Sequence, residues 1–358
     1  MEKKFKIAII GVGRAGSGMH VPSCLDVMNT EESIAEIVIC DVSKELVEKV
    51  GNEFNVEKRY SEIDSMLKNE KPDISIISNP PEFHRITLEK CLKSGSHIIL
   101  EKPSVPSVED LEAIIRFAEN YPGLRVMVNH NLRWYKETVG VMNIINKGLI
   151  GEPYWMEIRS LISRITSFKD SDPTYSKWLS KSKYQFLFEQ GVHWIDLFNF
   201  CLGEKPTQVY ARIPRKNVAK NDELSIVDIS YENGKSALLV QNYLTKIAGP
   251  PYIARVEGSE GSILAKWNPD MTDSSVEAYS TRFNSKMIPE LEEFPGGKWT
   301  DSEKFFAGQQ QIILKYFIEC IKQGKEPMPN LKEDMKTIKI LFAAYKSSTE
   351  SKIVDITE

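Results

Sequence analysis

The feature that most constrains the fold is a glycine-rich loop near the amino end of the chain. It reads Gly11-Val12-Gly13-Arg14-Ala15-Gly16 and directly follows the apolar run Phe5 to Ile10, which is typical of a buried parallel strand. The residues after this glycine loop, through Met28, predict a helix with Pro22 in its first turn or at a break. Gly-x-Gly-x-x-Gly alone is weak evidence, but between a strand and a helix it is the fingerprint of a dinucleotide-binding βαβ unit.

The residue types of the glycine loop suit a bound pyrophosphate. Gly11 permits the tight turn, Gly13 lets the backbone approach the phosphates, and Gly16 lets helix and strand pack closely. The next apolar run, Glu36 to Cys40, ends at Asp41, which we expect to accept hydrogen bonds from the adenosine ribose. Because a carboxylate there repels a 2′-phosphate, the sequence favours NAD over NADP. The predicted cofactor-binding residues of this segment are Gly11, Val12, Gly13, Arg14, Ala15, Gly16 and Asp41.

Strands and helices continue to alternate over the first third of the chain. Strands are predicted at Ile74 to Ser78, Ile98 to Leu100 and Arg125 to Val128, and helices at Ser61 to Asn69, Phe83 to Ser94 and Ser107 to Asn120. This alternation predicts a parallel sheet whose ligand lies beyond the carboxyl ends of the strands. Asn79-Pro80-Pro81 and Glu101-Lys102-Pro103 end two of these strands, so both segments are expected at the same edge as the glycine loop.

The pattern changes after about residue 124 and predicts a second, α+β domain with a largely antiparallel sheet. Its strands are expected at Tyr154 to Ile162, Gln208 to Ile213, Ser225 to Tyr231, Ser236 to Tyr243, Ile253 to Glu257 and Ser262 to Trp267, and its helices at Lys136 to Lys147, Phe186 to Leu202, Phe306 to Gln323 and Leu331 to Ser348. Asn233-Gly234 is a type I′ hairpin signal, and residues 268–304 are expected to form a long loop. The predicted fold class is α/β, with a dinucleotide-binding domain over 1–124 and a second domain over 125–358.

The long helix predicted from Phe186 carries a group of polar side chains. Glu189 and His193 are four positions apart and share a helix face, as do His193 and Asp196, three apart. A carboxylate beside an imidazole orients it and raises its pKa, which suits a general base near neutral pH. Taken alone, this segment fits a helix histidine with an incidental charged neighbour better than it fits a general base.

Composition excludes several classes of protein. The net charge of −4, without a long Lys/Arg run, argues against a nucleic-acid partner, and no apolar stretch reaches the roughly 18 residues of a membrane span. The N-terminus shows no signal-peptide pattern. The five cysteines are odd in number and scattered, which predicts buried thiols in a cytoplasmic protein. The five histidines show no zinc-ligand spacing, so no metal is expected.

Several ordered motifs together resemble the Gfo/Idh/MocA family, the oxidoreductases related to glucose–fructose oxidoreductase and inositol dehydrogenase. The match spans nearly the whole chain. The motifs that carry it are the glycine loop, Asn79-Pro80-Pro81-Glu82-Phe83-His84, the segment from Gly95 to Glu101-Lys102-Pro103, Asn131-Leu132-Arg133-Trp134 with Lys147-Gly148-Leu149-Ile150-Gly151, the segment from Glu189 to Leu197, and Val256-Glu257-Gly258-Ser259-Glu260-Gly261.

The resemblance implies a Rossmann domain followed by a domain with an open-faced sheet that often forms the oligomer interface, here of a homodimer or homotetramer. It implies hydride transfer between NAD(P) and a hydroxyl carbon of a sugar, cyclitol or related polyol. Lys102 matches the family's catalytic lysine near the nicotinamide, and His193 matches its proton acceptor. Glu189 stands where the family usually has Asp. Folding must then bring Lys102 and His193 to opposite sides of one small molecule on the dinucleotide.

The remaining candidates belong to the cofactor and substrate subsites. Asn79, Pro80, His84, Glu101 and Lys102 are expected near the nicotinamide, with His84 bracing the turn at Pro80. Asn131 and Arg133 either hold substrate or brace the domains. Trp178, in the polar stretch before the His193 helix, either packs on a sugar ring or is a surface residue.

Two other functions remain open from the sequence. One is a glycoside hydrolase that uses bound NAD for transient oxidation. The other is a non-enzymatic NAD-binding regulator, against which the presence of both Lys102 and His193 counts.

Overall fold

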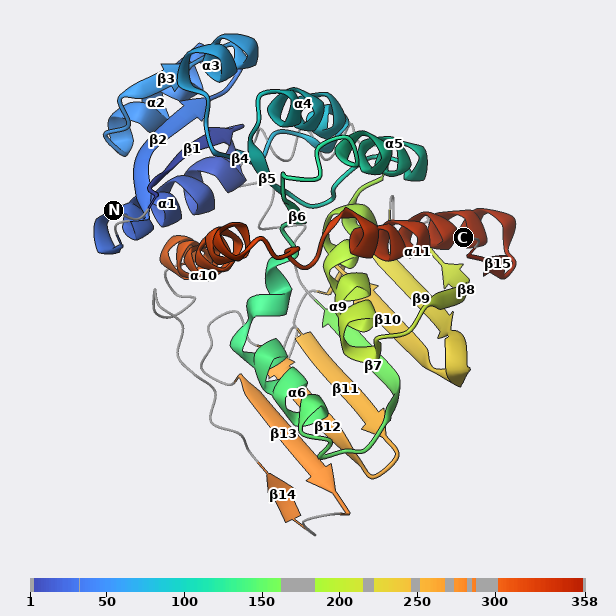
Figure 1. Cartoon of the computed structure of the whole chain (residues 1–358). Helices are drawn as coiled ribbons and strands as arrows, with labels where there is room; N and C mark the ends of the chain where they lie inside the picture. Colours follow the sequence, from blue (N-terminus) through green and yellow to red (C-terminus); the bar gives the residue numbers. More distant parts are fainter. Residues whose placement is uncertain are drawn as a thin grey trace. The chain divides into compact units, whose positions relative to one another are not determined.

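The computed structural model divides into two compact units. The first unit comprises Met1–Asn131 and Phe294–Met335, and the second comprises Leu132–Glu293 and Lys336–Glu358. The residues that the structure describes are 3–31, 33–161, 184–214, 222–245, 252–267, 274–281, 285–287 and 302–356. Figure 1 labels the helices and strands along the chain.

The first unit is built on a six-stranded parallel sheet in the order β3-β2-β1-β4-β5-β6. The strands are β1 (Phe5–Ile10), β2 (Ile34–Cys40), β3 (Lys58–Tyr60), β4 (Ile74–Ile77), β5 (His97–Leu100) and β6 (Val126–Val128). Short strands such as β4 are buried along their whole length, as expected of strands covered on both faces. The predicted Rossmann sheet is confirmed.

Helices separate these strands. They are η1 (Gly16–His20), α1 (Val21–Thr30), α2 (Lys44–Glu53), α3 (Ile63–Glu70), α4 (Pro81–Lys93) and α5 (Val108–Ala118). Ser43 and Ser107 cap α2 and α5 by accepting hydrogen bonds from the backbone N–H groups three residues on. The sequence predicts a helix that starts with Ser61 as its cap, which was wrong, because α3 begins at Ile63 with Glu62 in the cap position. α2 and β3 were not predicted from the sequence.

The first unit takes in more of the chain than residues 1–124. β6 completes the parallel sheet through its pairing with β5. α10 (Ser302–Gln323), far along the chain, packs against η1 and α1. The domain boundary predicted between residues 124 and 125 stays a prediction.

The second unit holds a nine-stranded sheet in the order β14-β13-β12-β11-β7-β10-β9-β8-β15. Its strands are β7 (Pro153–Leu161), β8 (Pro206–Arg212), β9 (Leu224–Tyr231), β10 (Ser236–Asn242), β11 (Tyr252–Gly258), β12 (Gly261–Trp267), β13 (Ser275–Ser280), β14 (Ser285–Met287) and β15 (Val354–Asp355). β7 and β10 pair in parallel and the other neighbours pair antiparallel, which confirms the predicted sheet.

Two details of this sheet bear on the predictions. Asn233 and Gly234 both adopt positive φ angles, 59° and 74°, which confirms the hairpin between β9 and β10. The long loop predicted over 268–304 was wrong in part, because β13 and β14 extend the sheet beyond β12. Their polar, alternating residues pair at the sheet edge, which their composition alone does not reveal.

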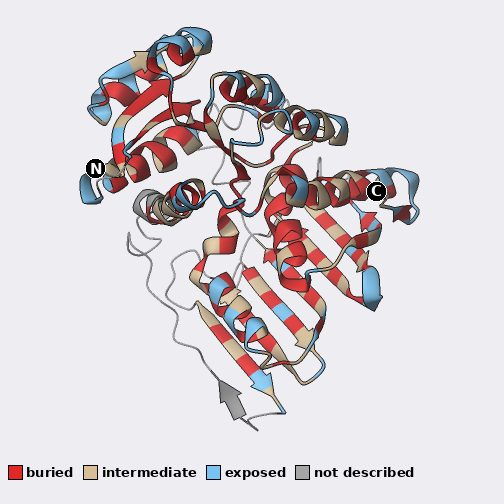
Figure 2. Ribbon diagram, viewed as in Figure 1, coloured by how far each residue is buried: buried red, intermediate tan, exposed pale blue. Residues whose placement is uncertain are grey.

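Helices cover one face of the second sheet. They are α6 (Lys136–Asn146), α9 (Val192–Leu202), preceded by η3 (Leu187–Gly191), and α11 (Leu331–Glu350), which begins in the first unit. α9 packs on β7 and β10, and α6 packs on β12 and β13. Along the strands buried residues alternate with intermediate or exposed ones (Figure 2). Leu238, Val240 and Tyr210 thus lie on the face opposite these helices, where Tyr210 is 42% exposed.

Candidate active site

The glycine loop follows β1 and has the shape expected of a phosphate cradle. Gly11 has a φ of +90°, and a side chain there would collide with the backbone of Asn79. A side chain at Gly16 would collide with the carbonyl oxygen of Gly11. A Cβ at Gly13 would meet no atom within 4 Å, so its backbone lies open to a ligand. These three environments match the three roles predicted for the glycines.

Asp41 is tied to this loop. Its Oδ2 accepts a hydrogen bond of 2.9 Å from the Val12 N–H, and its Oδ1 accepts one of 2.9 Å from the Ser43 N–H. The carboxylate is therefore fixed beside the glycine loop, at the carboxyl end of β2, in the position predicted from the sequence.

The helix after the loop starts at Arg14 and contains a π-turn, η1, before α1 begins at Val21. Ser17 holds the turn by donating from both its N–H and its Oγ to the Gly13 carbonyl oxygen, each at 2.9 Å. π-turns are frequent at functional sites. This one ends in His20, which is only 2% exposed.

Glu101, the residue before Lys102, is held by three hydrogen bonds. His20 Nε2 lies 2.8 Å and Asn129 Nδ2 lies 2.6 Å from Glu101 Oε1, and the Lys102 N–H donates to Oε2 over 3.1 Å. Burial alone would raise the pKa of the Glu101 carboxyl. Hydrogen bonds from His20 and Asn129 and the positive charge of Lys102 outweigh burial, and the pKa of Glu101 lies below its usual range. A buried carboxylate thus sits directly before a half-buried lysine.

Asn79 and His84 lie after β4, at the same edge. His84 Nε2 is 2.7 Å from the Asn79 carbonyl oxygen and Nδ1 is 2.9 Å from the Ser104 carbonyl oxygen. Burial lowers the pKa of the His84 imidazole, although both carbonyl contacts oppose the shift. Asn79 Nδ2 donates to Thr87 Oγ1 over 3.0 Å, whereas its buried Oδ1 has no hydrogen-bond partner in the described part of the chain. His84 therefore braces the turn at Pro80.

Residues of this edge fit a bound dinucleotide. The open backbone at Gly13 leaves room for a pyrophosphate, and Asn79 Oδ1 and Asn129 Oδ1 are buried acceptors that no described group satisfies. Asp41 offers carboxylate oxygens beside the loop. Gly11, Val12, Gly13, Arg14, Ala15 and Gly16 would hold the phosphates, and Asp41 the ribose hydroxyls.

One residue of this region was missed by the sequence analysis. Asp334, in the first turn of α11, accepts hydrogen bonds from Ser104 Oγ and, over 2.7 Å, from His130 Nε2. All three side chains are at most 1% exposed. Asp334 lies 230 positions from Ser104, so no local pattern in the sequence links the two.

The second unit holds the predicted Glu189 and His193 on one continuous helical stretch. Glu189 lies in the π-turn η3 and is partly exposed, while His193 lies in the first turn of α9 and is 7% exposed. Gly191 lies between them, where a Cβ would collide with Leu187 and approach Gln241 on β10 to 3.2 Å. The glycine therefore lets this turn pack closely on the sheet.

Asp222 fixes the start of that helix and was also missed. Its carboxylate accepts hydrogen bonds from the N–H groups of Gln185, Phe186 and Leu187, at 3.2, 2.8 and 3.2 Å, and from the Tyr345 hydroxyl. Asp222 is 2% exposed. It satisfies the free N–H groups of a helix N-terminus and is stabilised by the helix dipole.

Arg133 and Asp196 form a buried, bidentate ion pair within the second unit. Arg133 Nε and Nη2 lie 2.8 and 2.6 Å from the two carboxylate oxygens of Asp196, and the guanidinium stacks on Phe200 at 4.7 Å. The pair joins η2 (Asn131–Trp134) to α9. Asn131 starts η2 and is 8% exposed, and the predicted Trp178 lies outside the described residues.

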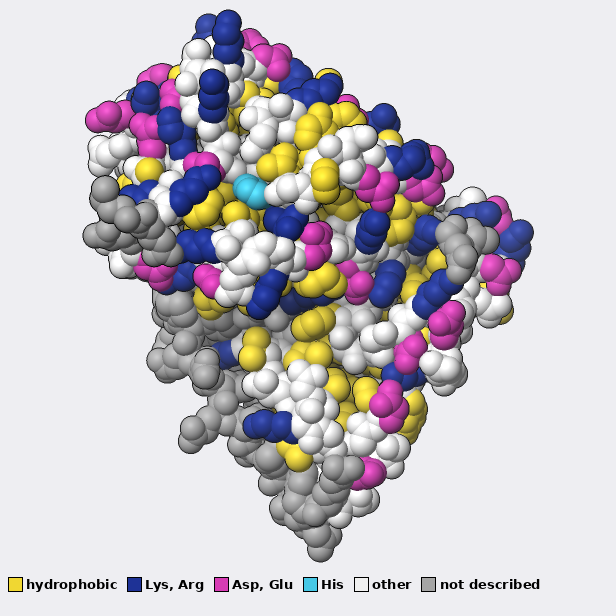
Figure 3. Space-filling model, in the orientation of Figure 1, with side chains coloured by type: hydrophobic (Ala, Val, Ile, Leu, Met, Phe, Trp, Pro, Cys, Tyr) yellow, Lys and Arg dark blue, Asp and Glu magenta, His cyan; other side chains and the backbone are white. Residues whose placement is uncertain are grey.

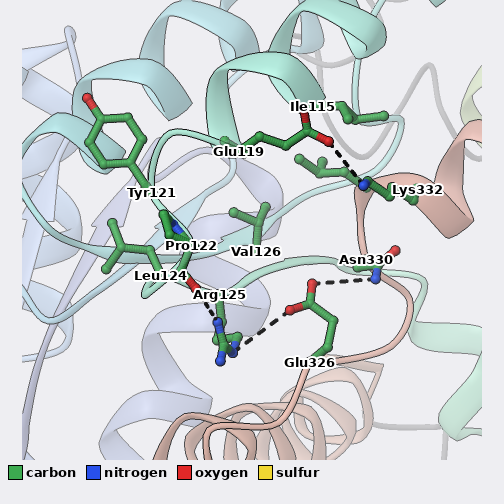
Figure 4. A pocket seen from close by; sticks show the side chains of 12 residues that line it. Ile115, Glu119, Tyr121, Pro122, Leu124, Arg125, Val126, Glu326, Asn330 and Lys332 are labelled. Atoms are coloured by element: carbon green, nitrogen blue, oxygen red, sulfur yellow. Dashed lines mark hydrogen bonds and ion pairs between the residues drawn. The ribbon is translucent and has the colours of Figure 1, made fainter.

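A separate pocket lies in the first unit, away from the glycine loop. Its walls come from the end of α5, the start of β6 and the segment leading into α11, and its volume is about 400 Å³ (Figure 4). Glu119 and Lys332 form an ion pair of 3.0 Å at this pocket, and Arg125 bonds the carbonyl oxygens of Gly324 and Lys325. Because it adjoins the amino end of β6, it lies at the opposite sheet edge from Asn79 and Lys102.

Four further observations concern the described part of the chain. No helix among the described residues is long and apolar enough to cross a membrane. Within the same residues, no group of three or more His, Cys, Asp and Glu side chains is placed to hold a metal ion. All five cysteines are buried free thiols, as predicted. Figure 3 shows Lys and Arg side chains interspersed with Asp and Glu over the face in view.

A Rossmann sheet with a glycine loop, an acidic residue after β2 and a lysine after β5 defines a dinucleotide-binding oxidoreductase. Two family models match the chain, together over more than half its length. Residues 5–130 match the oxidoreductase family with an NAD-binding Rossmann fold, and residues 139–264 match the Gfo/Idh/MocA C-terminal domain. The chain belongs to the Gfo/Idh/MocA family, and the predictions of family, fold class, enzyme class and NAD as cofactor are confirmed.

Relatives cover the chain almost completely. It is 25% identical to a D-apiose dehydrogenase of Paraburkholderia graminis, with 99% of this chain and 90% of the relative aligned. It is 21% identical to a myo-inositol 2-dehydrogenase of Thermotoga maritima, with 99% of each aligned. An Agrobacterium radiobacter oxidoreductase solved with NAD⁺, L-tartaric acid and magnesium shares its fold, with a TM-score of 0.83, 23% identity and 99% of each chain covered.

Proposed function

We propose that this protein is an NAD-dependent dehydrogenase that moves a hydride between the nicotinamide and a hydroxyl carbon of a sugar, cyclitol or related polyol. The observation that carries the proposal is the placement of Glu101 and Lys102 beyond β5, on the sheet edge that also holds the glycine loop. The relatives named dehydrogenases of D-apiose and myo-inositol support this substrate class.

NAD is proposed over NADP because of Asp41. Hydrogen bonds from the backbone of residues 12 and 43 hold its carboxylate beside the glycine loop. A fixed negative charge there accepts hydrogen bonds from ribose hydroxyls and repels a 2′-phosphate. Relatives include an inositol dehydrogenase named for NADP(+), from Bacillus subtilis, so this choice is a property of each chain.

The chain's residues have separate roles in the proposed reaction. Bound NAD supplies the hydride acceptor. Lys102, as a cation, stabilises negative charge developing on the substrate oxygen, and His193 accepts the proton of the substrate hydroxyl. Glu189, four positions before His193, supplies a carboxylate that orients the imidazole or contacts a substrate hydroxyl. His84 and Glu101 support the nicotinamide end of the site.

Three further residues have proposed roles, two of them in contact with the substrate. Asn131 is offered as a hydroxyl ligand, and Trp178 as a platform for a sugar ring. Arg133 is proposed to position η2 against α9, because its Nε and Nη2 both donate hydrogen bonds to the Asp196 carboxylate.

We propose a homodimer or homotetramer built on the second sheet. The face opposite α6 and α9 carries partly exposed apolar side chains, including Leu238, Val240 and Ile226, beside the exposed Tyr210. Such a patch is typical of an interface. We also propose a cytoplasmic location, because five free, buried thiols suit a reducing compartment.

The test is a substrate panel read by NADH absorbance with the purified protein. It contains D-apiose, myo-inositol, scyllo-inositol, L-sorbose, amino sugars and nucleotide sugars, each with NAD⁺ and with NADP⁺. The expected result is reduction of NAD⁺ by at least one sugar or polyol, and a loss of about a hundredfold or more in Lys102→Ala with NADH binding retained. Cleavage of a chromogenic glycoside without net NADH, or no turnover with any polyol, would contradict the proposal.

A further inference from the structure

We propose that Asp334 is a positioning residue for Lys102, acting through Ser104. This inference rests on the role proposed above for Lys102. It concerns a residue that belongs to none of the sequence motifs and lies near the opposite end of the chain.

The short segment around Lys102 has little structure of its own to fix it. β5 ends at Leu100 and α5 begins at Val108, so residues 101–107 belong to neither element. Glu101, Ser104 and Val105 are nevertheless buried, and Lys102 is only partly so. Side chains from elsewhere in the first unit must therefore fix the direction in which Lys102 leaves the backbone.

The segment is held on both sides of Lys102. On the amino side, Glu101 is bonded by His20 and Asn129, and Asn129 Nδ2 also donates to Gln310 Oε1 on α10 over 3.1 Å. On the carboxyl side, Ser104 is bonded twice. Its carbonyl oxygen faces His84 Nδ1 at 2.9 Å, and its hydroxyl donates to Asp334.

Asp334 is itself firmly placed. It is 0% exposed and lies in the first turn of α11, whose N-terminal N–H groups favour a carboxylate. Its N–H bonds the Asn330 carbonyl oxygen over 3.0 Å, and the same Asn330 caps the helix through the Glu333 N–H at 2.9 Å. Its second oxygen takes the hydrogen bond of His130. A carboxylate fixed in this way transmits its position to Ser104.

The consecutive residues Asn129 and His130 tie the two sides together. Asn129 bonds Glu101 and His130 bonds Asp334, while the Asn129 N–H donates to the Leu100 carbonyl oxygen over 2.7 Å. The loop after β6 thus holds the partners that flank Lys102 on both sides. Shifting Asp334 would move Ser104 without touching the glycine loop or Asp41.

The experiment compares Asp334→Asn in the parent protein and in the Lys102→Ala background, with the most active polyol of the panel. Asp334→Asn keeps the side-chain shape but removes one acceptor oxygen. We expect kcat to fall by about tenfold, with the Kd for NADH changed by less than about threefold. In the Lys102→Ala background we expect less than about a twofold further loss, because the lysine that Asp334 positions is gone.

Asp110→Asn is the matched control. Asp110 also accepts a hydrogen bond from a serine, Ser107 Oγ at 2.9 Å, but it lies in the first turn of α5, which Ser107 caps, and it does not bond residue 104. It should leave kcat within about twofold of the parent. Ser104→Ala removes only the bond to Asp334, and its effect should not add to that of Asp334→Asn.

Each of three outcomes overturns the proposal. If Asp334→Asn costs the same factor with and without Lys102, Asp334 supports the fold in general and does not position the lysine. If Lys102→Ala leaves turnover unchanged, the role of Lys102 fails, and with it this inference. Amide hydrogen exchange of the 101–105 peptide needs no substrate. Faster exchange in Asp334→Asn, but not in Asp110→Asn, supports the proposal, and unchanged exchange contradicts it.

Discussion

The two candidate catalytic groups are held in place in different ways. Lys102 lies in a segment without regular structure, and side chains of His20, His84, Asn129 and Asp334 fix the residues around it. His193 lies on a helix whose own hydrogen bonds fix most of its backbone. Among the described residues, outside support comes at its start from Asp222 and along its side from Arg133, Tyr231 and Thr337.

This difference has a physical basis. A segment outside helices and strands has unpaired backbone groups, so its position depends on many contacts with distant parts of the chain. A helix satisfies its backbone except at its ends. We therefore expect a single substitution near Lys102 to displace only the short segment around that residue. A substitution of Asp222 or Arg133 should instead displace the whole helix that carries His193.

The largest expected effect is the removal of the imidazole itself. His193→Asn should lower kcat by about a hundredfold to ten-thousandfold, since a positioned general base contributes on that scale. Binding of NADH, measured by fluorescence, should remain. Retention of parent turnover across the pH range would exclude His193 as the proton acceptor.

The side support of the helix should show the next largest effect. Arg133→Met removes the guanidinium that pairs with the buried Asp196 carboxylate, which costs about 3–5 kcal/mol in free energy of unfolding. Chemical denaturation measures this cost. Arg133→Met combined with Asp196→Leu should recover most of the loss, because it removes both charges. No recovery would show that the pair has a role beyond mutual compensation.

The cap of the helix should matter somewhat less. Asp222→Asn replaces one acceptor oxygen with a donor that faces backbone N–H groups, and we expect a loss of about 1–3 kcal/mol in stability. kcat should fall about tenfold, because Glu189 and His193 follow the displaced turn. Glu232→Gln, in the exposed hairpin between β9 and β10, is the control and should change neither quantity. Equal effects at both positions would contradict the specific role of Asp222.

On the side of the first unit, Asp41→Ala tests the cofactor preference. Loss of the carboxylate should reduce the preference for NAD⁺ over NADP⁺ by about tenfold, which corresponds to about 1.4 kcal/mol. Titration of both dinucleotides against the same protein measures this change. A parent protein that binds NADP⁺ more tightly than NAD⁺ would refute the interpretation of Asp41.

The smallest expected effect is a pH dependence from His84. Burial lowers the pKa of the imidazole, so between that pKa and about 6.5 the folded protein binds fewer protons than the unfolded chain. The neutral His84 imidazole therefore contributes fully to the free energy of unfolding above about pH 6.5, and this contribution is lost as the pH falls toward the lowered pKa. His84→Gln should flatten this decline in the midpoint of thermal unfolding. An unchanged acid decline would place its origin elsewhere.

The sequence predicted those parts of the site that depend on local spacing. The glycine loop, Asp41 and Lys102 each follow a strand of the parallel sheet, and Glu189 and His193 share one helical stretch, so periodicity is sufficient to place them. Asp334 and Asp222 could not be found in this way. Asp334 meets Ser104 across 230 positions and Asp222 meets Phe186 across 36, and only the folded chain brings them together.

Interpretations of single side chains were less complete than those of motifs. The sequence is compatible both with substrate binding by Arg133 and with bracing of the domains. It does not predict the buried ion pair with Asp196, because that residue lies 63 positions away. The residues of β13 show no clear strand pattern, so the sequence predicts a loop there. β13 is a strand because it pairs with β12 in the folded sheet.

The central claim, hydride transfer from a polyol to NAD⁺, is tested most directly with a labelled substrate. The most active polyol of the panel, deuterated at the carbon to be oxidised, is incubated with the protein and NAD⁺, and the NADH formed is analysed by mass spectrometry. The account predicts that the deuterium appears on the nicotinamide ring and that Lys102→Ala slows its transfer. Reduced cofactor that carries no deuterium would contradict the account.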